Sequence, residues 1–163
     1  MATVTRVLPW RRHSQPPAME VQEIIEQYRK FHPKRSTEVI SEAYRMAAGA
    51  HQGQLRRSGE PYITHPLAVA GIVARYGMDD VTIAAALLHD AVEDTVITLE
   101  ELEEKFGAEL TAIVDGVTKL ERIHFDTKEA QQAATMRKML VAMAKDLRVL
   151  VIKLADRLHN MRT

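Results

Sequence analysis

The sequence predicts an all-α fold, because residues that break helices are few and lie mostly near its start. All six prolines occur within the first 66 residues, and only three of the seven glycines follow Gly71. Alanine, leucine, methionine, glutamate, lysine and arginine, which favour helices, are abundant. No stretch alternates regularly between apolar and polar residues, as a half-buried strand would. The 163 residues are enough for one domain with a single core.

The composition excludes several functional classes. Lys and Arg together number 22, as do Asp and Glu, so the formal net charge is zero. Bulk charge therefore does not favour nucleic acid as a partner. The chain has no cysteine, which excludes a disulfide framework, a thiolate metal site and a catalytic thiol, and fits a cytoplasmic location. The longest apolar stretches, such as Ile83–Leu88, are too short to span a membrane, so no membrane association is expected.

The first third of the chain is expected to hold a leader, two helices and a loop. Residues 1–17, which carry arginines and prolines but no apolar signal core, are predicted to form a flexible leader. Apolar residues at helical spacing predict a short helix at Val21–Phe31. Ser36 can cap a second helix that runs to about Ala48. His51–Tyr62 contains two glycines and a proline, which favour a loop.

Three further helices follow in the middle of the chain. One is predicted from Pro66 to Tyr76, and it ends at Gly77, a residue suited to the position after a helix. The next starts near Asp79–Asp80 and runs through an apolar stretch to His89–Asp90. Thr98 begins a capping box for the third helix.

The last third is predicted to add more helices. The capped helix ends at Phe106–Gly107, and a short helix follows at Ala108–Val114. Leu120–Lys128 has the composition of an exposed connector, and Lys128–Lys145 and Leu147–Arg162 form a final helical pair. The last of these is apolar on nearly all sides, which predicts a central position in the fold.

The strongest chemical signal comes directly after the most apolar stretch. His89, Asp90, Glu93 and Asp94 would form two pairs spaced by four residues if they lay on one helix, so that four ionisable groups would share a short arc. Three carboxylates at the end of a core helix are costly unless a cation or hydrogen bonds compensate them. The alternative is a cluster of acids that caps the next helix, but capping does not require His89 and Asp90 beside the core.

Two more residues match this cluster in chemistry. His65 lies at the start of one predicted helix, and Asp156 lies within the apolar last helix. Taken singly, a loop or capping histidine and an aspartate in a salt bridge are the simpler interpretations. Together with His89 and Asp90 they supply two imidazoles and two carboxylates from separate helices. That mixed set suits a transition ion such as Mn, Fe or Zn.

Three segments of the sequence, in this order, resemble one family. Arg56–Pro66, Leu87–Thr95 and Lys153–Thr163 are similar to motifs of the N-terminal HD-type hydrolase domain of RelA/SpoT homologues, the bacterial Rel enzymes that make and degrade ppGpp and pppGpp. The residues His65, His89–Asp90 and Asp156 match the H…HD…D signature of HD phosphohydrolases. The resemblance implies an HD-domain helical bundle over residues 18–163. The leader resembles that of actinobacterial Rel.

The resemblance also implies roles for individual residues. His65, His89, Asp90 and Asp156 would bind one Mn²⁺. Glu93 and Asp94 would position and deprotonate the attacking water. The residues implied in binding the base, ribose or phosphate of the alarmone are Arg56, Arg57, Ser58, Asn160, Arg162 and Thr163. The implied reaction removes the 3′-diphosphate of ppGpp or pppGpp and gives GDP or GTP and pyrophosphate.

Three functional hypotheses remain open on the sequence. The first is an active Mn²⁺-dependent alarmone 3′-pyrophosphohydrolase. The second is a catalytically incompetent fragment with a metal-binding, regulatory or dimerisation role. The third is an HD hydrolase for another nucleotide, which the loop Arg56–Tyr62 and the end Asn160–Thr163 disfavour. Thr163 ends the sequence without a helix-terminating signal, so we expect a C-terminally truncated domain whose partners are the synthetase and regulatory domains of a longer protein. An apolar flank exposed there predicts a homo-oligomer.

Overall fold

The computed structural model describes residues 20–121, 137 and 146–162. In this part of the chain the regular structure is helical, and Leu55 and Pro61 form an isolated antiparallel bridge. The predicted all-α fold is therefore confirmed. The predicted leader (1–17), all but one residue of the predicted helix Lys128–Lys145, and Thr163 lie outside the described residues.

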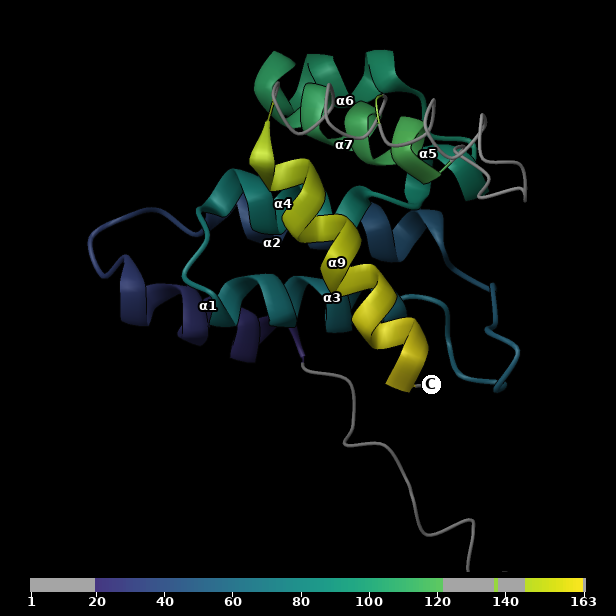
Figure 1. The fold of residues 1–163 in the computed structure, drawn as a ribbon, viewed down its shortest axis with the longest axis horizontal. Helices are drawn as coiled ribbons and strands as arrows, with labels where there is room; N and C mark the ends of the chain where they lie inside the picture. The colour runs from purple at the N-terminus through teal and green to yellow at the C-terminus, as the bar shows by residue number, and fades with distance from the viewer. Residues whose placement is uncertain (1–19, 122–136, 138–145, 163) are drawn as a thin grey trace, which may run out of the picture.

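The helices pack around α4, the most buried of them (Figure 1). This helix contacts α2, α3, α7 and α9, and all residues from Thr82 to Leu88 are buried. In Figure 1, α6 and α7 lie at the top, α1 and α3 lie at the bottom, and α9 crosses between them. The helices described are α1 (Val21–Phe31), α2 (Glu38–Ala50), α3 (Thr64–Arg75), α4 (Asp80–Leu88), α5 (Ala91–Asp94), α6 (Leu99–Phe106), α7 (Ala108–Glu121) and α9 (Leu147–Arg162).

Local signals placed several helix ends correctly. Asp79 precedes α4 and accepts a hydrogen bond from the backbone N–H of Thr82 at 3.0 Å. Thr98 precedes α6 and accepts one from the N–H of Glu101 at 3.2 Å. Gly77 follows α3 with φ of 74°, a left-handed conformation that costs glycine little. These three predicted ends are confirmed.

One predicted helix is interrupted, and the break lies at the residues of chemical interest. The helix predicted to run to His89–Asp90 ends earlier, at Leu88, and a separate helix, α5, starts at Ala91. His89 Nδ1 lies 2.6 Å from the carbonyl oxygen of Ala86, which the N–H of Asp90 would otherwise use in a continuous helix. The imidazole thus takes the place of a backbone donor.

The helix α7 is longer than predicted. It runs to Glu121, past the predicted end at Val114 and into the predicted connector Leu120–Lys128. The buried side chains of Ile113, Val117 and Leu120 continue the helical spacing of the apolar face. Packing of this face against the core stabilises the helix beyond the point that local composition indicated.

Gly116 lets α7 and α9 approach closely, and this gives a stability prediction. A Cβ at Gly116 would lie 2.7 Å from Cγ2 of the buried Val149. Gly116→Ala is therefore expected to destabilise the protein by about 1–2 kcal/mol, since overpacking outweighs the gain of about 1 kcal/mol in helix propensity. Urea unfolding measures this change.

A matched control separates crowding from helix propensity. Gly49 lies in α2, where an added Cβ would meet nothing within 4 Å. Gly49→Ala is expected to be neutral or to stabilise by about 0.5–1 kcal/mol. In the double variant Gly116→Ala/Val149→Ala, the loss of unfolding free energy should be smaller than the sum of the two single losses, because the shorter side chain relieves the contact. Strictly additive losses would contradict the close contact.

An arginine fixes the start of α9 against two other helices. Arg148 pairs with Asp146 at 2.8 Å, with Glu109 of α7 at 2.7 Å and with Asp79 at the start of α4 at 3.3 Å. Three acidic partners hold the pKa of this guanidinium above its ordinary value, with the hydrogen bond to Asp146 as the main cause. Asp156 lies two helical turns further along α9, so this junction helps to set its position.

One side of α9 remains exposed. Its buried residues are Val149, Ile152, Ala155 and Asp156, and they face α3, α4 and α7. Leu147, Leu154 and Met161 are 64%, 59% and 83% exposed. The prediction that α9 is central holds for the inner face only, and the predicted exposed apolar flank is present. Whether copies of the chain associate stays a prediction.

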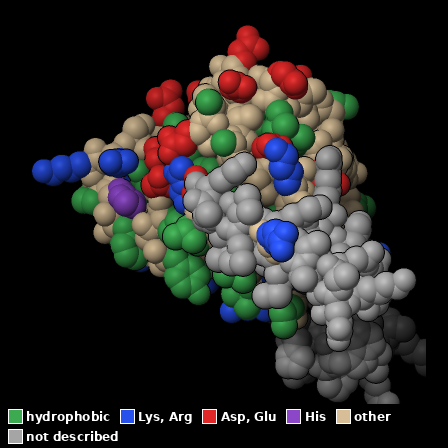
Figure 2. All heavy atoms as spheres, turned by 45° about the horizontal axis from the view of Figure 1, so that its top comes forward, with side chains coloured by type: hydrophobic (Ala, Val, Ile, Leu, Met, Phe, Trp, Pro, Cys, Tyr) green, Lys and Arg blue, Asp and Glu red, His purple; other side chains and the backbone are tan. Residues whose placement is uncertain are grey.

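One face of the described part of the molecule is mixed in charge (Figure 2). In the view of Figure 2, acidic, basic and apolar side chains are interspersed, and no continuous basic field covers the described part of this face. Among the described residues, no helix is both long enough and apolar enough to cross a bilayer.

Candidate metal centre

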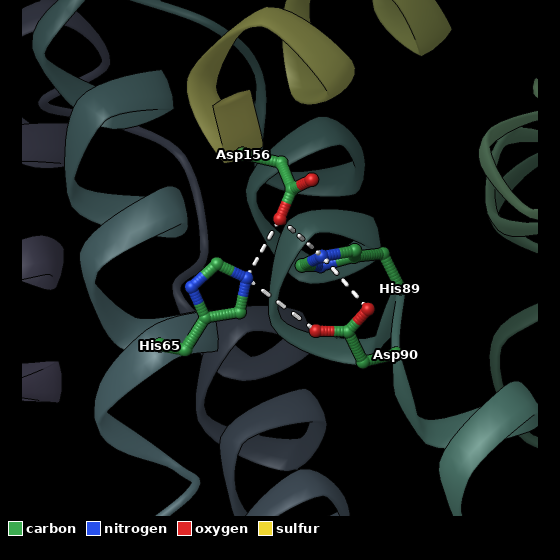
Figure 3. A group of neighbouring side chains, drawn as sticks. All are labelled: His65, His89, Asp90 and Asp156. Carbon is green, nitrogen blue, oxygen red and sulfur yellow. Dashed lines mark hydrogen bonds and ion pairs between the residues drawn. The ribbon is translucent and has the colours of Figure 1, made fainter. Parts of the chain in front are cut away.

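The four residues predicted as metal ligands lie together in the interior (Figure 3). His65 comes from the first turn of α3, His89 and Asp90 from the turn between α4 and α5, and Asp156 from α9. All four are buried, and one ligand atom from each lies within 4.8 Å of the others. Residues separated by up to 91 positions in the sequence thus converge on one point.

The separations of these atoms fit a shared cation. His65 Nε2 lies 2.7 Å from Asp156 Oδ1 and 3.5 Å from Asp90 Oδ2. His89 Nε2 lies 3.2 Å from Asp90 Oδ1 and 3.5 Å from Asp156 Oδ1. Ligand atoms that bind one ion at about 2.1 Å, at right angles to one another, are separated by about 3 Å. The observed separations scatter around this value, so the four side chains are close enough together to hold such an ion.

His89 is oriented as a ligand. Its Nδ1–H donates to the carbonyl of Ala86 at 2.6 Å, so Nε2 is left with its lone pair towards the carboxylates in the neutral ring. This Nε2 is buried and makes no hydrogen bond of good geometry to the described residues. Burial by itself lowers the pKa of His89, but the charges of Asp90 and Asp156 raise it to about 9.

The two buried carboxylates, Asp90 and Asp156, need a positive charge close to them, which either a metal cation or a proton on a neighbouring histidine can supply. The cation and the proton compete for the same imidazole nitrogen. Burial raises the pKa of Asp156, but the hydrogen bond from His65 and the ion pair with His89 outweigh it and hold that pKa well below its usual range. Lys153 adds a positive charge 3.3 Å from Asp156 Oδ2. Without an ion, a proton on the imidazole of His89 offsets the charge of the two carboxylates. A divalent ion fits between the carboxylates and this nitrogen, and it must displace that proton when it binds.

His159 orients His65 from behind. The Nδ1 atoms of the two rings are 2.7 Å apart, while His65 Nε2 faces the carboxylates. If His65 binds an ion through Nε2, its Nδ1 carries the proton and donates to His159 Nδ1. His159 must then be neutral, and burial together with the charge of His65 lowers its pKa to about 4.

The predicted acid pair lies beside this cluster and at the surface. Glu93 and Asp94 are exposed residues of α5, one turn beyond Asp90. Asp94 is exposed as a residue, but its carboxyl group is partly buried, and this partial burial and the nearby charge of Asp90 raise the pKa of Asp94. Their place at the exposed edge of the buried His and Asp cluster suits groups that exchange protons with water.

Sequence reasoning missed Tyr62, which connects the two sets of residues. Its hydroxyl lies 3.0 Å from Asp90 Oδ2 and 3.2 Å from Asp94 Oδ2. Both carboxylates raise the pKa of Tyr62, but burial is the largest cause. The only local signal was a tyrosine that ends a glycine-bearing loop directly before the helix of His65.

The predicted substrate-binding residues come from two segments, the turn around Arg57 and the end of α9. Arg56 is half-buried, whereas Arg57 and Ser58 are exposed at the tip of a turn closed by the bridge between Leu55 and Pro61. Asn160 and Arg162 are exposed at the end of α9. The charges of Arg56 and Arg162 both lower the pKa of His159, so both segments lie within electrostatic reach of it. Thr163 lies outside the described residues.

A buried cluster of two histidines and two aspartates, held by helices, is typical of HD domains. The HD domain family matches residues 43–163, and the chain belongs to this family. A solved structure described as a metazoan ortholog of SpoT that hydrolyzes ppGpp is similar in fold, with a TM-score of 0.59 and 31% sequence identity. The match covers 78% of this chain and 70% of that one.

Among characterised proteins, the relatives are RelA/SpoT homologues. A probable GTP pyrophosphokinase of Mycobacterium leprae is 51% identical over 162 residues, which are 99% of this chain and 20% of that protein. The guanosine-3′,5′-bis(diphosphate) 3′-pyrophosphohydrolase of Haemophilus influenzae is 56% identical over 118 residues, 72% of this chain and 17% of that protein. The bifunctional (p)ppGpp synthase/hydrolase SpoT of Escherichia coli is 50% identical over 131 residues, 80% of this chain and 19% of that protein. The chain thus spans at most a fifth of these three relatives, and the predicted resemblance is confirmed.

Proposed function

We propose that this chain is a Mn²⁺-dependent 3′-pyrophosphohydrolase of ppGpp and pppGpp. The observation that carries the proposal is the buried cluster of His65, His89, Asp90 and Asp156 beside the exposed acids of α5. Two of the relatives are named for ppGpp hydrolysis, and the similar solved structure is described as hydrolyzing ppGpp. The metal-binding, water-activating and nucleotide-binding roles given to individual residues are part of this proposal.

The residues divide the chemistry between them. The four buried residues would hold the ion, which lowers the pKa of bound water and offsets charge on the diphosphate. Glu93 and Asp94 would orient the water and take its proton. In the reaction, water adds across the bond between the 3′-oxygen and its phosphorus. The 3′-oxygen takes up a proton, pyrophosphate leaves, and GDP or GTP remains.

The two cationic segments would bind the nucleotide. Arg56 would stack on the guanine, and Arg162 would pair with phosphate, because a planar guanidinium suits both contacts. Arg57 and Ser58 at the turn, and Asn160 and Thr163 at the end of α9, would lie near the base or ribose. The charges of Arg56 and Arg162 both lower the pKa of His159, which supports a site that includes residues of both segments.

Pyrophosphate release from ppGpp tests the proposed function. Metal-stripped protein is expected to release almost none, and added Mn²⁺ should raise the rate by about 10³-fold or more, since the ion contributes several kcal/mol of transition-state stabilisation. GDP, which lacks a 3′-diphosphate, is the control nucleotide and should give no pyrophosphate.

The alternative is a fragment that binds metal without turnover and acts in regulation or dimerisation. The exposed apolar residues Leu147, Leu154 and Met161 of α9 favour it, because such a face is suited to contact with another domain or a second copy. A folded sample that binds Mn²⁺ but releases no pyrophosphate would support this alternative. Synthetase and regulatory domains would then be its partners.

A further inference from the structure

The hydroxyl of Tyr62 lies between a predicted metal ligand and a predicted proton acceptor. It is 3.0 Å from Asp90 Oδ2 and 3.2 Å from Asp94 Oδ2. Asp90 is buried, whereas Asp94 is exposed. Tyr62 therefore contacts one carboxylate in the interior and one at the solvent edge of the cluster. In sequence, Tyr62 is 28 residues from Asp90 and 32 residues from Asp94.

Among the described residues, the groups that face Asp90 include few hydrogen-bond donors, so the Tyr62 hydroxyl has a defined effect. Asp90 Oδ1 faces His89 Nε2 at 3.2 Å, and Oδ2 faces His65 Nε2 at 3.5 Å. When both imidazole nitrogens turn lone pairs to an ion, neither donates to Asp90. The phenolic O–H then supplies a donor that fixes the rotation of the Asp90 carboxylate. A fixed carboxylate presents its remaining lone pairs in one direction, which strengthens metal binding.

The loop before α3 holds Tyr62 firmly in this position. The ring packs against buried His51, with 4.6 Å between ring centroids and an interplanar angle of 35°. The N–H of Tyr62 donates to the carbonyl of Gln54 at 2.9 Å. The side-chain amide of Gln54 in turn donates to the carbonyl of Asp94 at 3.0 Å. Gln54 therefore connects the backbone of Tyr62 with the backbone of Asp94, the first through its own carbonyl and the second through its side chain.

We propose that Tyr62 is a positioning residue: its hydroxyl orients Asp90 for metal binding and couples that carboxylate to Asp94. The part concerning metal binding needs only the cation site, whereas the coupling to Asp94 rests on the proposed function. The residue acts through the two carboxylates.

A metal titration without nucleotide tests the first part. Tyr62→Phe removes the hydroxyl and keeps the ring on His51. Mn²⁺ affinity of the metal-stripped protein, measured by competition with a chromophoric chelator, is expected to fall about 10–100-fold, the usual cost of losing a hydrogen bond to a ligand. Tyr76→Phe is the matched control, because Tyr76 is 71% exposed at the end of α3, and its affinity should equal that of the unmodified protein.

Thermal unfolding of the metal-free variants separates positioning from folding. Metal-free Tyr62→Phe should unfold within a few degrees of the unmodified protein, so that the loss of affinity cannot be ascribed to unfolding. Equal Mn²⁺ affinity of the Tyr62→Phe and unmodified proteins would overturn the proposal. No step of this titration involves ppGpp, so its result is separate from that of the hydrolysis assay.

A double-mutant cycle tests the coupling. At saturating Mn²⁺, kcat for ppGpp is expected to fall in Tyr62→Phe with KM nearly unchanged, and to fall further in Asp94→Asn. If Tyr62 acts through Asp94, the double variant should be no slower than Asp94→Asn alone. Multiplied losses in the double variant would show independent action and overturn the coupling.

Discussion

Asp90→Ala is expected to abolish Mn²⁺ binding and, with it, pyrophosphate release from ppGpp. Asp90 is buried, and both of its oxygens face imidazole nitrogens of the other predicted ligands. Its removal leaves three ligands and takes a negative charge from a site that must hold a divalent ion. The loss in kcat/KM should be about 10³-fold or more, because metal catalysis contributes several kcal/mol.

Thermal unfolding measures the binding part of this prediction without any substrate. Mn²⁺ at 100 times its Kd stabilises the unmodified chain by about 2.7 kcal/mol, which for a domain of this size raises Tm by roughly 5–10 °C. Asp90→Ala should show no such shift. Glu100→Ala, an exposed acid of α6, is the control and should keep it. Full metal occupancy in Asp90→Ala would show that Asp90 is not a ligand.

Asp94→Asn is expected to give the second-largest loss of activity, and to do so with the ion in place. The variant keeps the shape of the side chain but can no longer accept the proton of water. Loss of a general base costs about 10²–10⁴ in rate, so kcat should fall by that factor while Mn²⁺ affinity changes by less than about 3-fold. Steady-state kinetics at saturating Mn²⁺ and a metal titration give the two quantities.

The stability of this variant provides an internal check. Burial and the charge of Asp90 raise the pKa of Asp94, so the folded state disfavours the ionised carboxylate. The protonated carboxyl of Asp94 therefore contributes to the free energy of unfolding at low pH, and this contribution is lost as the pH rises through the raised pKa of Asp94. Neutral asparagine should leave stability at pH 8 unchanged or slightly higher. A variant that loses both activity and its metal-dependent rise in Tm would instead place Asp94 among the residues that retain the ion.

Much of the fold is encoded in local sequence. Asp79, Thr98 and Gly77 mark helix ends correctly because capping depends on side chains and backbone within a few residues. The apolar spacing of Val21–Phe31 and Leu147–Arg162 also predicts those helices with their observed bounds. Within the part of the chain that the structure describes, the two errors named above have different causes. In α7, packing of a buried face prolongs the helix to Glu121. After α4, a local hydrogen bond from His89 to Ala86 accompanies the end of the helix.

The set of His65, His89, Asp90 and Asp156 was indicated by residue type and by the resemblance of three motifs. The sequence by itself determined which donors are available: two imidazoles and two carboxylates, with no thiol. It did not determine that their ligand atoms lie within 4.8 Å of one another. That convergence depends on the packing of α3 and α4 against α9, which brings together residues far apart in the chain.

The contacts around the four residues were decided by tertiary structure alone. Nothing in the spacing indicates that Tyr62 reaches Asp90 and Asp94 or that His159 meets His65. Periodicity reports which side of an element is apolar, because burial of one side imposes a repeat on neighbouring residues. A hydrogen bond across the fold imposes no repeat, so the partners of the predicted ligands become visible only when the helices are packed.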